Sequence, residues 1–191
     1  MKPEYIEGQT FDKIDFTAQL LAKTEYEHCT FTNCDFSNAD LSGSIFITCA
    51  FAGCNLSLAK LSHTVFNDVT FKDCKMLGLQ FGECNAFVLL FTVDQCMLDH
   101  SSFYKLKLKK MTFKNSKLEE VDFTETDLSG SIFDNCDLTR ATFDSTVLER
   151  TDFRTSYNYS IDPERNRIKK AKFSLPGIAG LLDKYDIVIA H

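Results

Sequence analysis

A large apolar residue recurs at every fifth position along most of this chain. The first series begins at Phe11 and continues to Phe91 with one break, at Ala86, and the second continues unbroken from Leu98 to Phe153. An α-helix repeats roughly every 3.6 residues and a β-strand about every 2, so neither element alone produces this spacing. A short fixed period of this kind predicts a solenoid built from small repeats.

A second inward position precedes each central residue by two places and carries a small or β-branched side chain. The residue between the two is often Asp or Asn, as in NADLS at 38–42 and ETDLS at 125–129. The repeat unit therefore reads small, polar, Phe or Leu, polar, polar. All eight cysteines occupy the small position: Cys29, Cys34, Cys49, Cys54, Cys74, Cys84, Cys96 and Cys136.

One interruption of the period can be located from a repeated heptapeptide. DLSGSIF occurs at 40–46 and again at 127–133, and the offset, 127 − 40 = 87, equals seventeen repeats of five plus two residues. We place the two extra residues in TVDQCM at 92–97, between the two series. Because this stretch is rich in neither Pro nor Gly, we expect a bulge or distorted corner joining two coaxial stacks, and no domain boundary.

The repeat resembles that of the pentapeptide-repeat family over roughly residues 6–160. The resemblance implies an all-β fold, a right-handed quadrilateral parallel β-helix in which four repeats make one coil, with a short C-terminal helix and tail. Residues 1–160 would form this solenoid and residues 161–191 a capping or dimerisation segment. In the second series Phe alternates with Leu, which places Phe on two opposite faces. The core is expected to include Phe36, Leu41, Phe46, Phe123, Leu128 and Phe133.

The composition limits the partners and the location of the protein. No run of eighteen apolar residues and no apolar leader near the first residues are present, so we expect a cytoplasmic protein with no membrane association. Of the 27 acidic and 21 basic residues, 13 and 6 lie in residues 1–100 (net −7), which leaves 14 and 15 in the remainder (net +1). A net-acidic chain is poorly suited to binding nucleic acid directly. The basic run KLKLKKMTFKNSK at 105–117 is interpreted as a solvated face.

Nothing in the sequence indicates an enzyme. The chain contains no GxSxG, P-loop, GxGxxG or HExxH motif, so we predict no catalytic residue and no cofactor site. Cysteines spaced by five do not match zinc-ligand spacing, and a buried free cysteine acts as a compact apolar residue. We therefore predict no metal site and, in a reducing compartment, no disulfides.

The repeat ends after Phe153, and the following segment carries different signals. Ser174 is a candidate cap for a short helix that starts near Pro176, and the apolar stretch 187–189 follows. The segment could simply cap the last coil, or a continuous apolar face could pair two chains tail to tail. PGIAGLLDKYDIVI resembles the C-terminus of the Qnr-type quinolone-resistance subgroup, which implies a homodimer through Leu175, Ile178, Leu181, Leu182, Ile187 and Val188.

The subgroup resemblance also implies a partner. It suggests a protein that imitates DNA in shape and charge, binds a type II topoisomerase (DNA gyrase or topoisomerase IV) and protects it from fluoroquinolones. We expect no long projecting loop. The alternative is a structural or scaffold protein of the wider family with another protein partner. Mimicry requires outward carboxylates in columns, and the candidates flank the central residues: Asp12, Asp15, Asp35, Asp40, Asp99, Glu119, Glu120 and Asp137.

Overall fold

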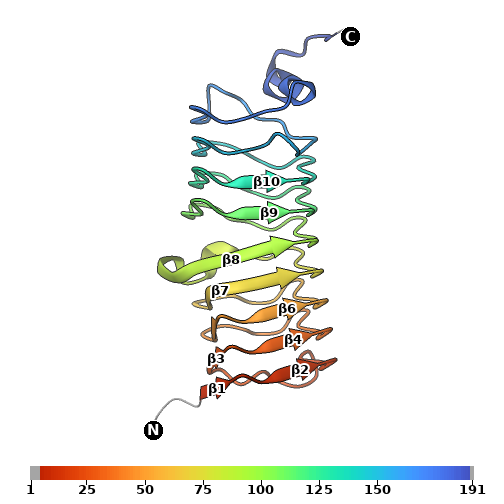
Figure 1. The fold of residues 1–191 in the computed structure, drawn as a ribbon, viewed down its shortest axis with the longest axis vertical. Helices are drawn as coiled ribbons and strands as arrows, with labels where there is room; N and C mark the ends of the chain where they lie inside the picture. The colour runs from red at the N-terminus through yellow and green to blue at the C-terminus, as the bar shows by residue number, and fades with distance from the viewer. Residues whose placement is uncertain (1–4, 190–191) are drawn as a thin grey trace.

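The backbone winds in square coils that stack into a rod (Figure 1). The computed structural model describes residues 5–189, with Tyr5 at one end of the rod and the last helices at the other. Pairing between strands is parallel, and a residue usually faces the residue 20 places further along the chain, as Tyr5 faces Glu25. The predicted fold class, the right-handed quadrilateral β-helix, is confirmed.

Each coil has four faces, and the same faces stack from coil to coil. Two neighbouring faces, D and A, carry the strand ladders, whereas B and C are held mainly by isolated parallel bridges. We name the faces by their central residues: face A includes Phe11, Phe31, Phe51, Phe71, Val93, Phe113, Phe133 and Phe153; face B Phe16, Phe36, Leu56, Met76, Leu98, Leu118 and Leu138; face C Leu21, Leu41, Leu61, Phe81, Phe103, Phe123 and Phe143; and face D Tyr26, Phe46, Phe66, Leu108, Leu128 and Leu148.

The strands are short because each face of a coil offers only about three extended residues before the next corner. Face D carries β1 (Tyr5–Glu7), β3 (Glu25–Glu27), β5 (Ile45–Ile47) and the first part of β7 (Val65–Lys72). Face A carries the rest of β7 with β2 (Thr10–Asp12), β4 (Thr30–Thr32), β6 (Ala50–Ala52), β9 (Thr112–Lys114) and β10 (Ile132–Asp134). Like β7, β8 (Leu89–Asp94) begins on face D and ends on face A.

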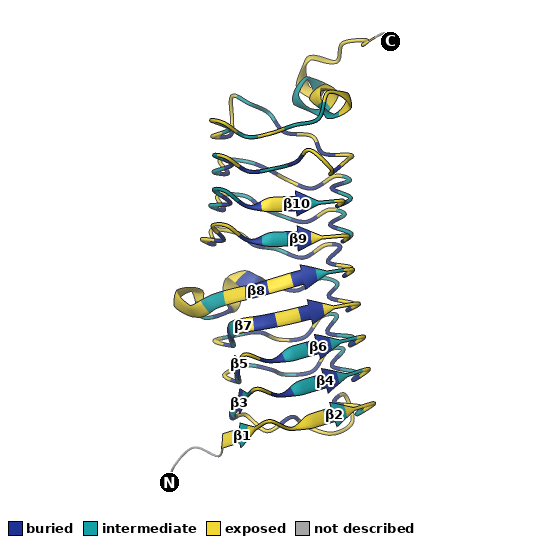
Figure 2. Cartoon of the chain, viewed as in Figure 1, coloured by how far each residue is buried: buried dark blue, intermediate teal, exposed yellow. Residues whose placement is uncertain are grey.

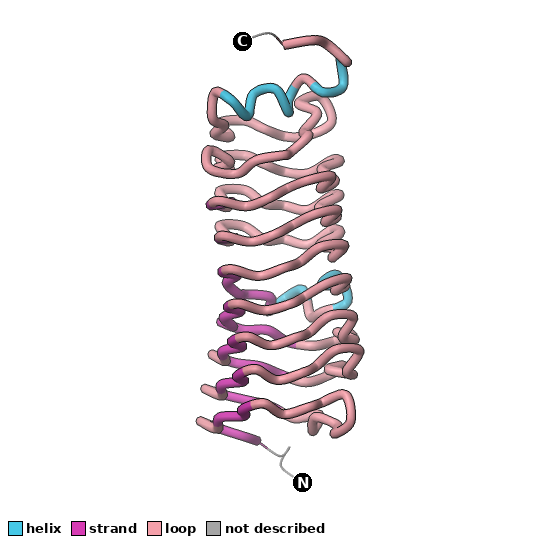
Figure 3. The backbone as a smooth tube through the Cα atoms, turned by 90° about the vertical axis from the view of Figure 1, so that its right-hand side faces the viewer, coloured by secondary structure: helices cyan, strands magenta, loops and turns pink. Residues whose placement is uncertain are grey.

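Four short 3-10 helices complete the described structure: η1 (Phe81–Glu83), η2 (Ala86–Val88), η3 (Pro176–Leu181) and η4 (Asp183–Tyr185). The first two lie beside the middle of the rod, and the last two cover its C-terminal end (Figure 3). Within residues 5–189, none of the helices has the length and apolarity needed to cross a bilayer.

The core is a column of stacked side chains, dark blue in Figure 2. Every core residue predicted from the period is fully buried. Rings stack directly on the same face of the next coil, with centroids 4.7 Å apart for Phe31 and Phe51 and 5.3 Å for Phe103 and Phe123. In the C-terminal half the phenylalanines occupy the opposite faces A and C, as the alternation with Leu predicts.

The small inward position has a second role besides compactness. Its hydroxyl or thiol donates to the carbonyl of the central residue 23 positions earlier, as from Thr64 Oγ1 to Leu41 O at 2.9 Å and from Cys49 Sγ to Tyr26 O at 3.2 Å. A buried carbonyl without a partner is costly, so a small side chain that can donate is favoured there. This explains why Cys, Ser and Thr recur at a position where Ala would also fit.

The corners hold a backbone conformation that most residues avoid. The residue two places after the centre is left-handed in most repeats, including His28 (φ 52°) and Lys105 (φ 61°). Such a conformation costs a non-glycine residue about 1–2 kcal/mol. Stacking offsets that cost, because the amide of each such corner is oriented toward the next coil, as in His28 N to Ile47 O at 3.0 Å.

The predicted position of the two extra residues, 92–97, is wrong. Asn85 N still bonds to Thr64 O with the regular spacing of 21, whereas Leu89 pairs with Phe66 at a spacing of 23. The insertion therefore lies within residues 85–90, which we call the slip loop. Asp68, at a corner of β7, has no pairing partner in β8. The spacing between paired residues is therefore 23 for Asn67 and Leu90 but 22 for Val69 and Phe91, two more than the regular 20.

The shifted register exchanges the large and small residues of one repeat. Val93 pairs with Phe71 and takes the central place, while Phe91 pairs with Val69 and takes the small place. Val93 and Phe91 are each only 1% exposed. The Phe91 ring stacks on Phe81 at 5.3 Å and fills the space that a second large central residue would otherwise occupy. Coil-to-coil pairing then continues to Lys172, beyond the predicted end of the repeat at residue 160.

Candidate protein-interaction surfaces

The aspartates that precede the central residues close the corners of the coils. Asp35 Oδ1 accepts a hydrogen bond from Ser37 N at 2.8 Å, and Asp127 Oδ1 accepts one from Ser129 N at 3.0 Å. Burial raises the pKa of Asp127, but the hydrogen bonds from Ser129 and the nearby Lys109 more than offset it and hold that pKa below its ordinary value. These carboxylates therefore have a structural role that any surface function must share.

The predicted acidic residues do not form one continuous surface. Asp12 lies on face A, where it pairs with Thr32, and Asp40 lies on face C, where it bridges to Lys60. The other six gather on face B or its corner, but Asp99 is only 6% exposed and is not an outward group. The face B set consists of Asp15, Asp35, Asp99, Glu119, Glu120 and Asp137.

Basic side chains neutralise the C-terminal acids of face B. Lys117 Nζ lies 2.7 Å from Glu119 and 3.3 Å from Asp99. Arg140 contacts Glu119 and lies 2.7 Å from Glu120. The Lys117 ammonium lowers the pKa of Glu119. Asp99, Glu119 and Glu120 therefore form a braced cluster rather than a column of free negative charge. Asp15 and Asp35, near the N-terminal end, have no ion pair among the described residues, and neither has Asp137, which accepts hydrogen bonds from Thr139 and Asn158.

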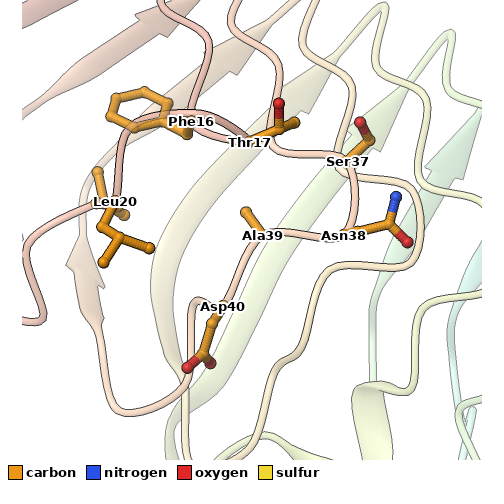
Figure 4. Close-up of a pocket in the computed structure, with 8 residues that line it drawn as sticks. Phe16, Thr17, Leu20, Ser37, Asn38, Ala39 and Asp40 are labelled. Atoms are coloured by element: carbon orange, nitrogen blue, oxygen red, sulfur yellow. The ribbon is translucent and has the colours of Figure 1, made fainter.

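A shallow hollow of about 410 Å³ lies beside Asp40 in the first coils (Figure 4). It forms where the first coil departs from regular corner geometry after Phe16, which leaves Leu20 87% exposed. Lys23 Nζ lies 2.8 Å from Asp40 Oδ2 and holds the pKa of this carboxyl well below its usual range. The lining of the hollow is half apolar, from Phe16, Leu20, Leu21 and Ala39, and half polar, from Thr17, Ser37, Asn38 and Asp40.

The slip loop is a small projection that the sequence prediction does not include. Its tip residue Phe87 is fully exposed, and Val88 and Leu90 are 39% and 52% exposed. The loop stands out from the rod beside β8 and is largely yellow in Figure 2. The apolar run AFVLLF at 86–91 was the available signal. Its apolar residues were consistent with a core segment, and only the register reveals that Phe87, Val88 and Leu90 are exposed whereas Phe91 is buried.

The C-terminal segment caps the rod through two glycines that touch Tyr159. A Cβ on Gly180 would lie 2.0 Å from Tyr159 O, and one on Gly177 would lie 1.9 Å from Tyr159 Oη. This close approach lets Ile161 N donate to Gly180 O at 2.9 Å. Ser174 Oγ accepts from Gly177 N at 3.2 Å, at the start of η3.

An ion-pair cluster fastens η4 to the same coil. Lys184 Nζ lies 2.8 Å from Asp162 and 2.7 Å from Glu164, and these carboxylates raise the pKa of Lys184. Leu181, from η3, packs against the core and closes the end of the hydrophobic column.

The other residues predicted for a dimer interface project from this cap. Leu175 is 84% exposed, Ile178 42%, Ile187 57% and Val188 97%. Leu182 is half-buried. The cap therefore does two things at once, because Leu181 closes the core while its neighbours leave an apolar surface at the end of the rod.

The cysteine thiols lie inside the rod. All eight cysteines are free and buried, and burial raises the pKa of Cys84 and of Cys136 to about 12, so both remain protonated thiols. Among residues 5–189, no group of three or more His, Cys, Asp or Glu side chains is arranged to hold a metal ion.

Family models match most of the chain. A model described as pentapeptide repeats (8 copies) matches residues 11–46 and 49–85, and one described as a pentapeptide repeat region matches residues 91–158. The chain belongs to the pentapeptide-repeat family. The break between the matched ranges, at residues 86–90, coincides with the slip loop that displaces the register of this pentapeptide-repeat protein.

Solved structures of QnrB1, described as a plasmid-mediated fluoroquinolone resistance protein, have a similar fold. A trypsin-treated variant of QnrB1 aligns with a TM-score of 0.62 and 18% identity, over 99% of this chain and 100% of that one. Full-length QnrB1 aligns with a TM-score of 0.55 and 19% identity, over 96% and 100% of the two chains. No curated protein sequence gave a significant match. At this identity the likeness is one of fold.

Proposed function

We propose that this pentapeptide-repeat protein binds a type II topoisomerase, DNA gyrase or topoisomerase IV, and protects it from fluoroquinolones. The observation that carries the proposal is the extent of the structural likeness, which includes the whole rod and the C-terminal cap of a fluoroquinolone resistance protein. Asp15 and Asp35 supply unpaired carboxylates on face B, where a surface that normally receives DNA phosphates would meet them.

The test is a gyrase supercoiling assay with ciprofloxacin and increasing amounts of the purified protein. We expect supercoiling to recover. The double variant Asp15→Asn, Asp35→Asn should recover less, because it removes two charges but keeps the corner acceptor, as Asn55 shows by accepting from Ser57 N at 3.2 Å. Asp122→Asn on face C is the matched control and should behave like the parent. No recovery at any concentration of the parent protein would refute the proposal.

We also propose that the active form is a homodimer joined through the exposed apolar residues of the cap. Leu175 and Val188 are the most exposed of the predicted interface residues, so their replacement by Asp should not disturb the core. The double variant Leu175→Asp, Val188→Asp is expected to be a folded monomer by light scattering at high salt, where contacts between exposed charges are screened. Leu181→Asp is a poorer test because Leu181 packs against the core. A dimer that survives the double substitution would restrict the segment to capping.

The scaffold alternative has one observation in its favour, the bracing of the C-terminal acids by Lys117 and Arg140. A braced cluster presents little net charge to a DNA-binding surface. If the protein neither pulls down gyrase nor restores supercoiling, this second function would be supported.

A further inference from the structure

Face D carries opposite charges at its two ends. At the N-terminal end, its outward side chains include Glu7, Glu25 and Glu27 from β1 and β3. Glu27 contacts Tyr5 and His28, whereas Glu7 and Glu25 have no ion-pair partner among residues 5–189. This end of the face is therefore an uncompensated negative patch.

The C-terminal half of face D is basic. Its segments stack through bridges from Lys107 to Asp127, from Asp127 to Val147 and from Val147 to Arg167. Two of its basic residues are paired, Lys109 with Asp127 and Arg167 with Glu149. Five have no ion-pair partner within the described part of the chain: Lys107, Lys110, Arg150, Lys169 and Lys170.

The middle of face D is apolar. Ile45 and Ile47 occupy the outward positions of β5, and Val65 occupies the first outward position of β7. Each of these side chains is partly exposed. The slip loop follows on the same face, since Leu89 pairs with Phe66 of β7, and it adds the fully exposed Phe87.

We propose that face D binds face D of a second copy of this chain in antiparallel orientation. Reversing one rod brings its acidic end, with Glu7 and Glu25, against the basic end of the other, with Lys169 and Lys170, and the two-fold relation repeats this pairing at the opposite end. The fifth of the nine stacked segments, which carries Leu89 and the slip loop, lies at the two-fold axis, so the exposed Phe87 side chains of the two copies lie near each other, with Val65 of each copy beside them. A parallel arrangement would place like charges together and is disfavoured.

The available area suits a weak, specific contact. Face D comprises nine stacked segments, and at about 4.8 Å per coil they span roughly 40 Å. With a width of roughly 15 Å, the two faces together bury about 1,200 Å², near the lower limit for specific protein pairs. Association should therefore depend on protein concentration and weaken at high salt, because exposed charges are screened. The cap remains free, so this contact is separate from the proposed tail interface.

Charge reversal at one end of the face provides the decisive test. Variant one carries Glu7→Lys and Glu25→Lys, and variant two carries Lys169→Glu and Lys170→Glu. Both are made with Leu175→Asp and Val188→Asp so that the tail does not contribute. Sedimentation equilibrium should show that each variant alone associates about tenfold more weakly than the parent. Mixing the two should restore association, because only the mixed pair is complementary at both ends.

A cysteine placed near the axis gives an independent readout in the otherwise natural chain. All native thiols are buried, so the thiol that Phe87→Cys introduces would be the only exposed one among the described residues. Oxidised glutathione should convert this variant to a disulfide-linked dimer, with the glutathione taking up the two electrons and two protons. Leu20→Cys, which is nearly as exposed but lies on face C at the N-terminal end, should not cross-link. Equal cross-linking of both variants, or a mixture that associates no better than its components, overturns the proposal.

Discussion

Replacement of Gly180 by Ala should detach the C-terminal cap while leaving the coils intact. The new Cβ would lie 2.0 Å from Tyr159 O, a backbone atom that cannot rotate away. Helix η3 must therefore move outward by more than an ångström. The shift breaks the hydrogen bond from Ile161 N to Gly180 O, worth about 1 kcal/mol, and partly exposes Leu181, worth about a further 1–2 kcal/mol.

The expected loss, about 2–3 kcal/mol, is local because the cap contacts only the last coil. A loss of this size corresponds to hydrogen exchange at the Ile161 amide that is roughly 30- to 150-fold faster. The amide of Phe123, in the middle of the rod, should exchange at its original rate. Gly82→Ala is the matched control, because its Cβ would meet nothing closer than Tyr104 O at 3.4 Å. If Gly180→Ala leaves the exchange of Ile161 unchanged, the close approach of the glycine is not what holds the cap.

Two further predictions concern the coils. Phe123→Ala removes a ring stacked 5.3 Å from Phe103 and 5.2 Å from Phe143, and should lower the free energy of unfolding by about 3–5 kcal/mol in urea titrations; a loss below about 1 kcal/mol would show that the column relaxes around the cavity. The hydrogen bond from Arg154 is the main cause that lowers the pKa of Asp152 to about 2, below the unfolded value of about 3.9. The ionised Asp152 therefore stabilises the folded state fully above about pH 3.9, and this stabilisation is lost as the pH falls through 2. Urea midpoints from pH 6 to pH 2.5 should fall less steeply for Asp152→Asn than for the parent, and equal slopes would contradict this assignment.

The period of five was sufficient to predict a solenoid and its core, and the resemblance to the pentapeptide-repeat family supplied the four-sided coil. A single large residue per face leaves no ambiguity about which side chains point inward, and Phe36 and Leu128 are buried as expected. The register slip was misplaced because Phe91 continues the first series by coincidence while occupying the small position. The sequence alone does not show whether Phe91 or Val93 is the central residue of this repeat. The pairing of Val93 with Phe71 shows that it is Val93.

The candidate surfaces were less accessible to sequence reasoning. The period identifies outward positions, and Asp15 and Asp35, twenty residues apart, lie on one face. It does not reveal that the Lys117 side chain forms ion pairs with both Asp99 and Glu119 and neutralises them. Such pairing depends on side-chain reach across coils. The cap shows the same limit, since Leu181 and Val188 are both apolar but only Leu181 packs against the core.

The stacking of identical coils has a consequence for how the protein is made. Each coil forms hydrogen bonds with the one before it, as when Ile45 N donates to Thr24 O, so a completed coil is a template for the next twenty residues. A chain synthesised from its N-terminus can therefore add coils in order as it leaves the ribosome, without waiting for distant segments. Until the final segment emerges, the growing end exposes both its hydrophobic column and unpaired backbone groups. The cap that the two glycines hold against Tyr159 thus ends the stacking of coils. A nascent chain arrested before Gly177 would keep the hydrophobic column and the unpaired backbone groups of its last coil exposed, and could associate with other chains.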